Sequence, residues 1–189
     1  MKQKELSLRR KEQMAASLKK LMAKKDLQKI TIQDIADDCS MNRYTFYYHF
    51  QDIYDLVSWT FRRDFEQIFS DRARCSTFEE WIQTLLEYLK NNEEVCKCAL
   101  NSLGRVSFRK LCAEDLSVFL QPLLKDIRGS RDIPDDYLNF LANFYLEAVS
   151  GVLIQWILGE MPLSEKALVS YLHLTLEGGP EAALDRYVL

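Results

Sequence analysis

A turn of three residues fixes the organisation of the N-terminal part of the chain. The segment 39–41 is too short for another element, and it separates two short segments with helical patterns. Thr31 and Asn42 stand just before these segments, and the side-chain oxygen of each can accept from the free amides at a helix start. The pattern predicts short helices over residues 32–38 and 42–49. Two such helices after a longer one form a helix-turn-helix.

The rest of the chain also has helical patterns. It contains only 6 Gly and 4 Pro, and no run of alternating β-branched residues suggests a strand. We expect an all-α fold, with a helix-turn-helix domain over residues 1–50 and a helical domain over residues 51–189. Pro122 should kink or divide its helix. Besides the two short helices, apolar residues spaced by three or four predict helices over about residues 5–26, 51–72, 78–89, 93–103, 107–128, 135–158 and 164–177.

Composition narrows the class of protein. The chain has 189 residues, and 48% of them are apolar, which is enough for a packed core. Its uncharged apolar stretches fall far short of the roughly 18 residues that suggest a membrane span. The N-terminus is charged and lacks the apolar segment and cleavage site of a secretory signal. We therefore expect a cytoplasmic protein with no membrane partner.

Charge is distributed unevenly along the chain. Residues 1–50 contain 11 Lys or Arg and 6 Asp or Glu, whereas residues 51–189 contain 14 and 22. A basic end on a chain of net charge −3 is expected where that end meets phosphate. The alternative is that these lysines only solvate a helix face, and the charge distribution alone does not decide between the two.

Cysteine and histidine offer little material for a metal site or for catalysis. Five cysteines are an odd number, which argues against a disulfide framework. Cys96 and Cys98 would point to different sides of a helix, and His49 and His173 are the only histidines. The chain also lacks a phosphate-cradling glycine loop and a nucleophile with a plausible base. We expect no metal, no cofactor and no enzymatic activity.

The segment from Thr31 to Phe50, TIQDIADDCSMNRYTFYYHF, resembles the DNA-binding segment of the TetR/AcrR family of bacterial transcriptional regulators. It has the family's Thr-x-x-x-Ile-Ala before the turn and Thr-Phe-Tyr-Tyr-His-Phe after it. The resemblance covers about residues 5–60, and it implies about nine helices, with effector binding and dimerisation in the C-terminal domain. A weaker similarity, in residues 50–56 and in the helix that contains Trp156, is to regulators of dihydroxyacetone kinase operons.

The second short helix has the side chains that a recognition helix needs, namely base-reading groups at its start and phosphate-binding groups around them. Arg43 can form a bidentate pair with guanine, and Tyr44 can touch a base or a thymine methyl group. As alternatives, His49 can be packed in the core and one of the adjacent tyrosines can be buried, as Phe46 and Phe50 should be. The predicted DNA contacts are Thr31, Asn42, Arg43, Tyr44, Thr45, Tyr47, Tyr48 and His49.

Three positions depart from the family pattern. The family commonly has a small residue where Tyr44 stands, which implies a different base contact or a wider separation from the base. It usually has glycine where Ser40 stands, so this serine should carry mild strain or a less positive φ. Many members open the fourth helix with lysine where this chain has Ile53, so one phosphate contact is missing.

The two long apolar helices at the end of the chain predict a homodimer built as a four-helix bundle. A broad apolar stripe over residues 135–158 exceeds what one side contact needs, and Gly151 would let another helix come close. The alternative is that both helices are core of a monomer. The predicted dimer contacts are Phe144, Ala148, Gly151, Leu168 and Leu172.

An effector pocket should lie among the aromatic and apolar side chains of the C-terminal domain, because sites for small ligands are usually lined by such groups. Each of these residues can equally be plain core. The predicted pocket residues are Trp81, Leu85, Tyr88, Phe108, Phe119, Tyr145 and Trp156.

Together these features predict a dimeric transcriptional regulator that binds double-stranded DNA at a near-palindromic operator and is released by a small-molecule effector of unknown class. The alternative is a co-activator or adaptor that acts through protein contacts, with weak or no DNA binding. The slope of DNA affinity against salt separates the two, because several phosphate contacts give a steep fall.

Overall fold

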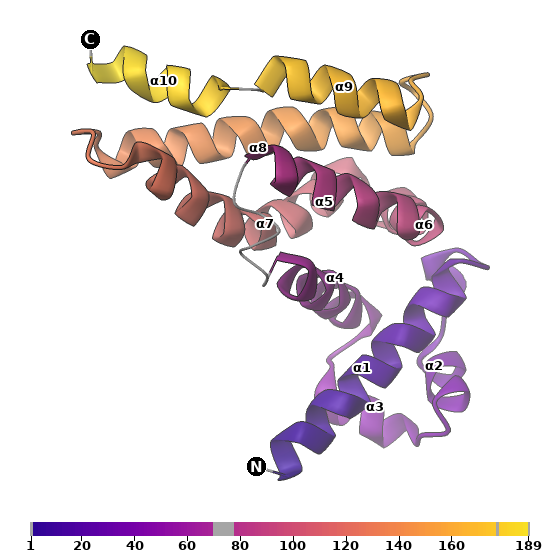
Figure 1. Ribbon diagram of the computed structural model, residues 1–189. Helices are drawn as coiled ribbons and strands as arrows, with labels where there is room; N and C mark the ends of the chain where they lie inside the picture. Colours follow the sequence, from indigo (N-terminus) through magenta and orange to yellow (C-terminus); the bar gives the residue numbers. More distant parts are fainter. Residues whose placement is uncertain (1, 70–77, 177, 189) are drawn as a thin grey trace. The chain divides into compact units, whose positions relative to one another are not determined.

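The computed structural model describes residues 2–69, 78–176 and 178–188, and this part of the chain contains helices and no strand (Figure 1). The prediction of an all-α fold is therefore confirmed. The helices are α1 (Lys2–Met22), the 3-10 helix η1 (Leu27–Lys29), α2 (Ile32–Asp38), α3 (Arg43–His49), α4 (Ile53–Phe69), α5 (Phe78–Asn91), α6 (Glu93–Leu103), α7 (Arg105–Arg128), α8 (Asp135–Ile157), α9 (Glu165–Leu176) and α10 (Gly179–Val188).

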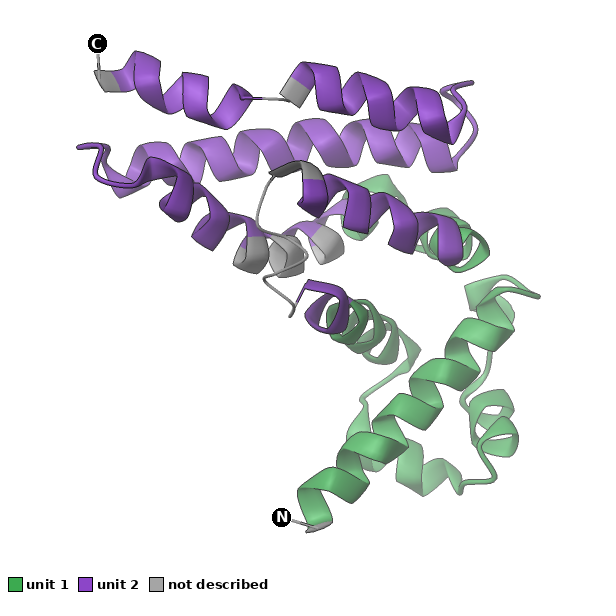
Figure 2. Ribbon diagram, in the orientation of Figure 1, with its two compact units in different colours: residues 1–64, 93–108 green, residues 65–92, 109–189 purple. Residues whose placement is uncertain are grey.

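The helices form two compact units (Figure 2). The head unit consists of Met1–Asp64 and Glu93–Phe108, and the body unit consists of Phe65–Asn92 and Arg109–Leu189. Helix α4 has residues in both units. The domain boundary at residue 50 stays a prediction.

The core of the head unit is built on the apolar stripe of α1. Met14 and Leu18 lie on one face of this helix and are at most 1% exposed. Helix α1 contacts both α2 and α3, which contribute the fully buried Ile35 and Phe46. This shared core fixes the geometry of the helix-turn-helix, because any rotation of α3 would expose a large aromatic ring.

Helix α6 also belongs to the head unit. It contacts α1 and η1, and the Cys98 thiol donates to the backbone oxygen of Lys25 at 3.6 Å. Just after α6, the ring of Phe108 meets Phe61 of α4 edge to face, with 5.4 Å between ring centroids. A segment of the chain's second half is therefore part of the head core.

The body unit is organised around α8. This helix is long and apolar enough to cross a membrane by length and composition alone, but 44% of that stretch is buried in the structure. Helices α9 and α10 run along α8 (Figure 1). At one end Tyr137 stacks on Tyr187 of α10, with 4.4 Å between centroids, and at the other Trp156 Nε1 donates to the Leu163 oxygen at 3.0 Å.

Two features of the body unit bear on the predicted helix boundaries. Helix α7 continues through Pro122, which excludes the division that was one of the two expectations for this proline. Helix α10 was not predicted at all, because the Gly-Gly-Pro sequence at 178–180 suggested a stop. Helix α9 is described as far as Leu176, and Gly178 has φ +63°. Pro180 lies in the first turn of α10, where a missing amide hydrogen costs little.

Candidate nucleic-acid interface

A capping box fixes the start of α2. The Thr31 hydroxyl accepts from the Asp34 amide at 3.1 Å and donates to the Asp34 carboxylate at 2.8 Å. The same carboxylate accepts from the Thr31 amide at 2.7 Å and from Lys25 Nζ at 2.9 Å. The hydrogen bond from Lys25 lowers the pKa of Asp34 to about 2, with those from Thr31 contributing. Thr31 is exposed, but its hydroxyl is already used within the head unit.

The turn between α2 and α3 is closed by backbone hydrogen bonds and one strained residue. The Met41 amide donates to the Ala36 oxygen at 2.8 Å, and the Ser40 amide donates to the Asp37 oxygen at 3.1 Å. Ser40 has φ +52°, in the left-handed region that favours glycine. Of the two expectations for this position, the structure shows the strained one.

Helix α3 has one buried side and one exposed side. Phe46 and the following Phe50 are 1% and 3% exposed, so both are buried anchors as predicted. Tyr44 and Tyr48 are 82% and 78% exposed, and Tyr47 is 52% exposed. Both adjacent tyrosines are therefore exposed, and the alternative that one of them is buried does not hold.

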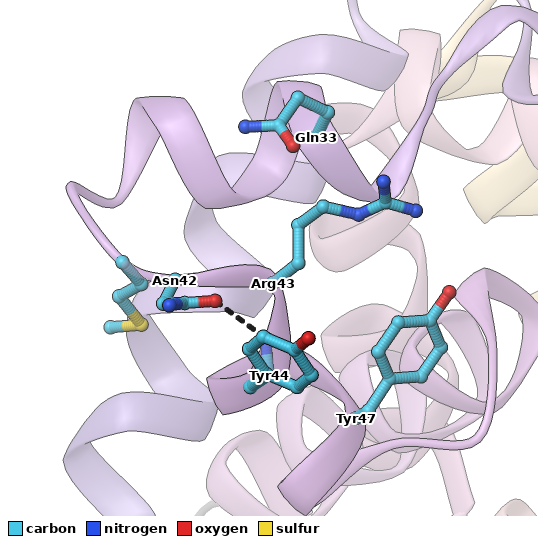
Figure 3. A pocket seen from close by; sticks show the side chains of 6 residues that line it. Gln33, Asn42, Arg43, Tyr44 and Tyr47 are labelled. Carbon is cyan, nitrogen blue, oxygen red and sulfur yellow. Dashed lines mark hydrogen bonds between the residues drawn. The ribbon is translucent and has the colours of Figure 1, made fainter.

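A polar hollow of about 600 Å³ lies between the start of α2 and the start of α3. In Figure 3, Arg43 reaches out between Gln33 of α2 and Tyr47 of α3. An amide, a guanidinium and phenol groups are the hydrogen-bonding groups that meet base edges and phosphates. The sequence analysis did not single out Gln33, whose Nε2 donates to Asp37 at 2.6 Å, or Met41, which also lines the hollow.

Asn42 serves as the cap of α3. Its Oδ1 accepts from the Tyr44 amide at 2.9 Å, which confirms the predicted helix start. This bond uses the oxygen of the side chain, and Asn42 is exposed and lines the hollow. One residue therefore ends the turn and contributes to the surface that Arg43 also lines.

His49 is a half-buried member of the predicted DNA contacts. Its Nε2 is buried with no hydrogen-bond partner among the described residues, and its ring lies edge to face against Tyr48 at 4.9 Å. Burial lowers the pKa of the imidazole, and the charges of Lys11 and Arg10 lower it further. His49 is therefore neutral at pH 7. Thr45, in the same helix, is half-buried.

The start of α4 is acidic. Asp52 Oδ1 accepts from the Asp55 amide at 2.8 Å, and the Asp55 carboxylate accepts from the Gln51 amide at 3.0 Å. Ile53, where many family members have lysine, is half-buried and lies between Asp52 and Asp55 in the sequence. The helix start is thus capped by its own side chains and carries negative charge.

The predicted pocket residues belong to both units. Phe108 packs on Phe61 in the head unit, and Trp81, Leu85 and Tyr88 are buried on α5 in the body unit. Tyr145 is buried on α8, where its hydroxyl is 3.1 Å from the position that a Cβ on Gly179 would take. Trp156 caps the loop before α9, and the side chain of Phe119 lies outside the described residues.

Some of the predicted dimer residues are exposed in the single chain, and others are buried in it. Phe144 and Ala148 are exposed on α8, and nothing lies within 4 Å of where a Cβ on Gly151 would stand. Leu168 and Leu172 of α9, in contrast, are 1% and 8% exposed, so they pack inside the body unit. Further exposed apolar side chains of these two helices are Phe140, Tyr171 and Leu174.

Within the described residues there is no cluster of His, Cys, Asp and Glu that would hold a metal ion. Cys39, Cys96 and Cys98 are free thiols, and burial raises the pKa of Cys96 to about 12. The side chains of Cys75 and Cys112 lie outside the described residues.

A helix-turn-helix whose second helix anchors one side in the core and exposes the other defines a class of DNA-reading regulators. The chain belongs to the TetR family: the model described as "Bacterial regulatory proteins, tetR family" matches residues 16–58, and "Transcriptional regulator C-terminal region" matches residues 76–178. This membership confirms the predictions of a transcriptional regulator and of a protein that is not an enzyme.

Two known proteins are similar to the chain. It is 31% identical over 80 residues to the HTH-type dhaKLM operon transcriptional activator DhaS of Lactococcus lactis subsp. lactis (strain IL1403). That match covers 42% of this chain and 43% of the relative, so it spans less than half of either. The solved structure of a dihydroxyacetone kinase operon activator DhaS has the same fold, with a TM-score of 0.65 at 19% identity over 94% of this chain and 95% of that one.

Proposed function

We propose that the chain binds double-stranded DNA as a homodimer, with α3 of each protomer in the major groove of a near-palindromic operator. The observation that carries this proposal is the two-sided character of α3. Phe46 anchors the helix in the core, while Tyr44 and Tyr48, the most exposed aromatic residues of the described chain, project from its other side. Exposed aromatic groups gathered on one short helix indicate a binding surface.

Arg43 is the proposed base-reading residue. It stands in the first turn of α3, it is exposed, and it makes no ion pair with any described residue. Its guanidinium is therefore available for a bidentate pair with guanine, which discriminates by roughly 1–3 kcal/mol. Tyr44 beside it is placed to touch a base or a thymine methyl group.

Residues around Arg43 and Tyr44 are the proposed phosphate contacts. Tyr47, Tyr48 and Asn42 are exposed residues whose side chains can donate hydrogen bonds, and Thr45 is half-buried in the same helix. Thr31 can donate to a phosphate only by exchanging its bond to Asp34 for one to DNA. These groups set the position of α3 in the groove, whereas Arg43 sets the sequence.

Dimerisation is proposed through the exposed side of α8 and α9. Phe140 and Phe144 are one turn apart on α8, and their rings are stacked at 6.4 Å with 55–59% of each residue exposed. Tyr171 and Leu174 contribute exposed apolar surface from α9. The open space at Gly151 supports close approach of a second helix, as the sequence pattern predicted. Two copies of α8 and α9 would then form the four-helix bundle.

We further propose that a small-molecule effector binds the body unit and changes the spacing of the two heads, in a protein located in the cytoplasm. Helix α4 is the proposed transmitter because its residues belong to both units. A coupling free energy of about 1–3 kcal/mol would change DNA affinity by roughly 5–150-fold.

Selection of bound duplexes from a random pool tests this function. We expect enrichment of two inverted half-sites whose centres lie about one helical turn, roughly 34–36 Å, apart. The R43A variant provides the matched control, because it should retain weak binding and lose the enrichment of one base pair in each half-site. Absence of enrichment, with an affinity that hardly changes with salt, would favour an adaptor acting through protein contacts.

A further inference from the structure

We propose that Arg10 of α1 is an additional phosphate-contacting residue, which holds the DNA backbone beside the C-terminal end of α3. This inference rests on the proposed function and assigns to the interface a helix outside the helix-turn-helix. It follows from how α1 is oriented in the head unit and from where the positive and negative charges lie.

One edge of α1 faces the helix-turn-helix. Arg10, Gln13, Ser17 and Lys20 are spaced by three and four residues, so they share that edge. The Gln13 backbone oxygen accepts from the Cys39 thiol at 3.5 Å, and Lys20 forms an ion pair with the Asp38 carboxylate. Ser17 between them is buried.

The other edge of α1 faces α4. Glu12 pairs with Arg63 at 2.9 Å, and Lys19 pairs with Asp64 at 2.5 Å. These contacts fix the rotation of α1 about its axis from both sides. Arg10, one turn before Gln13, therefore lies on the edge that faces α2, the turn and α3.

The neighbouring residue fixes which part of α3 Arg10 is near. Lys11 Nζ lies 5.2 Å from the centroid of the Phe50 ring and 5.7 Å from that of Trp59. Phe50 directly follows α3, so α1 passes the C-terminal end of α3 at this level. The charge of Arg10 also acts on His49, the last residue of α3. The guanidinium itself is exposed and makes no ion pair with a described residue.

The charges around the start of α4 are unfavourable for a phosphate, which favours a phosphate contact at Arg10 instead. The start of α4 has no positively charged side chain for a phosphate, because Ile53 stands where many family members have lysine. The backbone amides of Gln51 and Asp55 are also already used, since they donate to the carboxylates of Asp55 and Asp52. A phosphate on that side would meet two carboxylates. The positive charge of Arg10 at the end of α3 offers an alternative point of attachment for the backbone.

The test compares R10Q with R9Q in the full-length protein. Arg9 is an exposed arginine on the same helix, paired with Glu5 at 3.0 Å, and it points about 100° away from Arg10. The probe is a labelled mixed-sequence duplex of roughly 30 base pairs, titrated between about 50 and 200 mM salt. We expect the slope of log K against log salt to decrease in magnitude by about 0.9 per bound protomer in R10Q, and to be unchanged in R9Q.

Each outcome decides a different point. R10K should restore the slope, because a phosphate contact depends more on the positive charge than on the bidentate geometry of a guanidinium group. A steep slope in the unsubstituted protein with equal slopes in R10Q and R9Q would overturn the role of Arg10 alone. A flat response in the unsubstituted protein would overturn the proposed function, and this inference with it. Loss of helicity in R10Q would show that Arg10 has a structural role and would also overturn the inference.

Discussion

Arg63 holds the Glu12 carboxylate through two nitrogens, with Nε at 3.2 Å and Nη2 at 2.9 Å from the same oxygen. The pair joins α4 to α1 between residues 51 positions apart, and both side chains are partly buried. We expect a double-mutant cycle with E12Q and R63Q to give a coupling free energy of about 0.5–1 kcal/mol in urea unfolding.

The exposed pair of Arg9 and Glu5, on the solvent side of α1, is the control for that cycle. Its side chains are 72% and 63% exposed, so water screens the charges. The coupling measured with R9Q and E5Q should be at most half as large. Equal coupling in both cycles would mean that burial adds nothing to the Glu12 pair.

Replacing Ser40 by glycine should stabilise the protein. Ser40 has φ +52°, a conformation that costs a non-glycine residue about 1–2 kcal/mol. Glycine removes that cost but gains conformational freedom in the unfolded chain, so we expect a net gain of about 0.5–1 kcal/mol in the free energy of unfolding. S40A keeps the strain and should show no gain. A lower melting temperature for S40G would contradict this account.

The Asp34 carboxylate should make the head unit sensitive to acid. Its pKa falls from 3.8 to about 2 on folding, so the folded state favours the ionised form. Its contribution to stability is present above about pH 4 and is lost as the pH falls towards 2. The urea concentration at the midpoint of unfolding should be measured at several values between about pH 5 and pH 2. It should fall less steeply with decreasing pH in D34N than in the unsubstituted protein.

Replacing Arg43 by alanine should weaken specific DNA binding without affecting the fold. The side chain is exposed and makes no ion pair within the described residues, so helicity and self-association should not change. The loss should be roughly 1–3 kcal/mol on the selected operator, with relaxed preference at one base pair of each half-site. Unfolding of the variant would instead assign Arg43 a structural role.

Introducing a charge on the exposed side of α8 should separate the protomers. Phe144 is 55% exposed in the single chain, and F144D would place a carboxylate in the proposed apolar interface. Light scattering should then report the monomer mass. V106D is the control, because Val106 is a 72% exposed apolar residue of α7 outside that surface. A dimer that persists in F144D would exclude this side of α8.

Local signals predicted the helix-turn-helix well. The caps at Thr31 and Asn42 are contacts between near neighbours in the sequence, so the starts of α2 and α3 could be identified from residue type and spacing. Phe46 and Phe50 were assigned to the core from their match to the family pattern. The left-handed turn at Ser40 was one of two expectations because a serine alone does not determine φ.

Long-range packing accounts for most of what the sequence left open. An apolar stripe shows which side of a helix is buried but not which helix covers it, so Leu168 and Leu172 were assigned to the dimer rather than to the interior of the body unit. Likewise, the orientation of Arg10 depends on contacts of α1 with Cys39 and Arg63, which lie far away in the sequence. The effector pocket stays a prediction for the same reason.

The inclusion of residues 93–108 in the head unit limits how this protein can be divided. The chain leaves the head after Asp64 and returns to it at Glu93, so a fragment ending after α4 would lack Phe108 and the α6 surface against α1. A chimera made by joining the N-terminal segment of a relative to the remainder of this chain would pair α1 of one protein with α6 of the other. To transfer the whole head unit, both of its segments, 1–64 and 93–108, must come from the same protein.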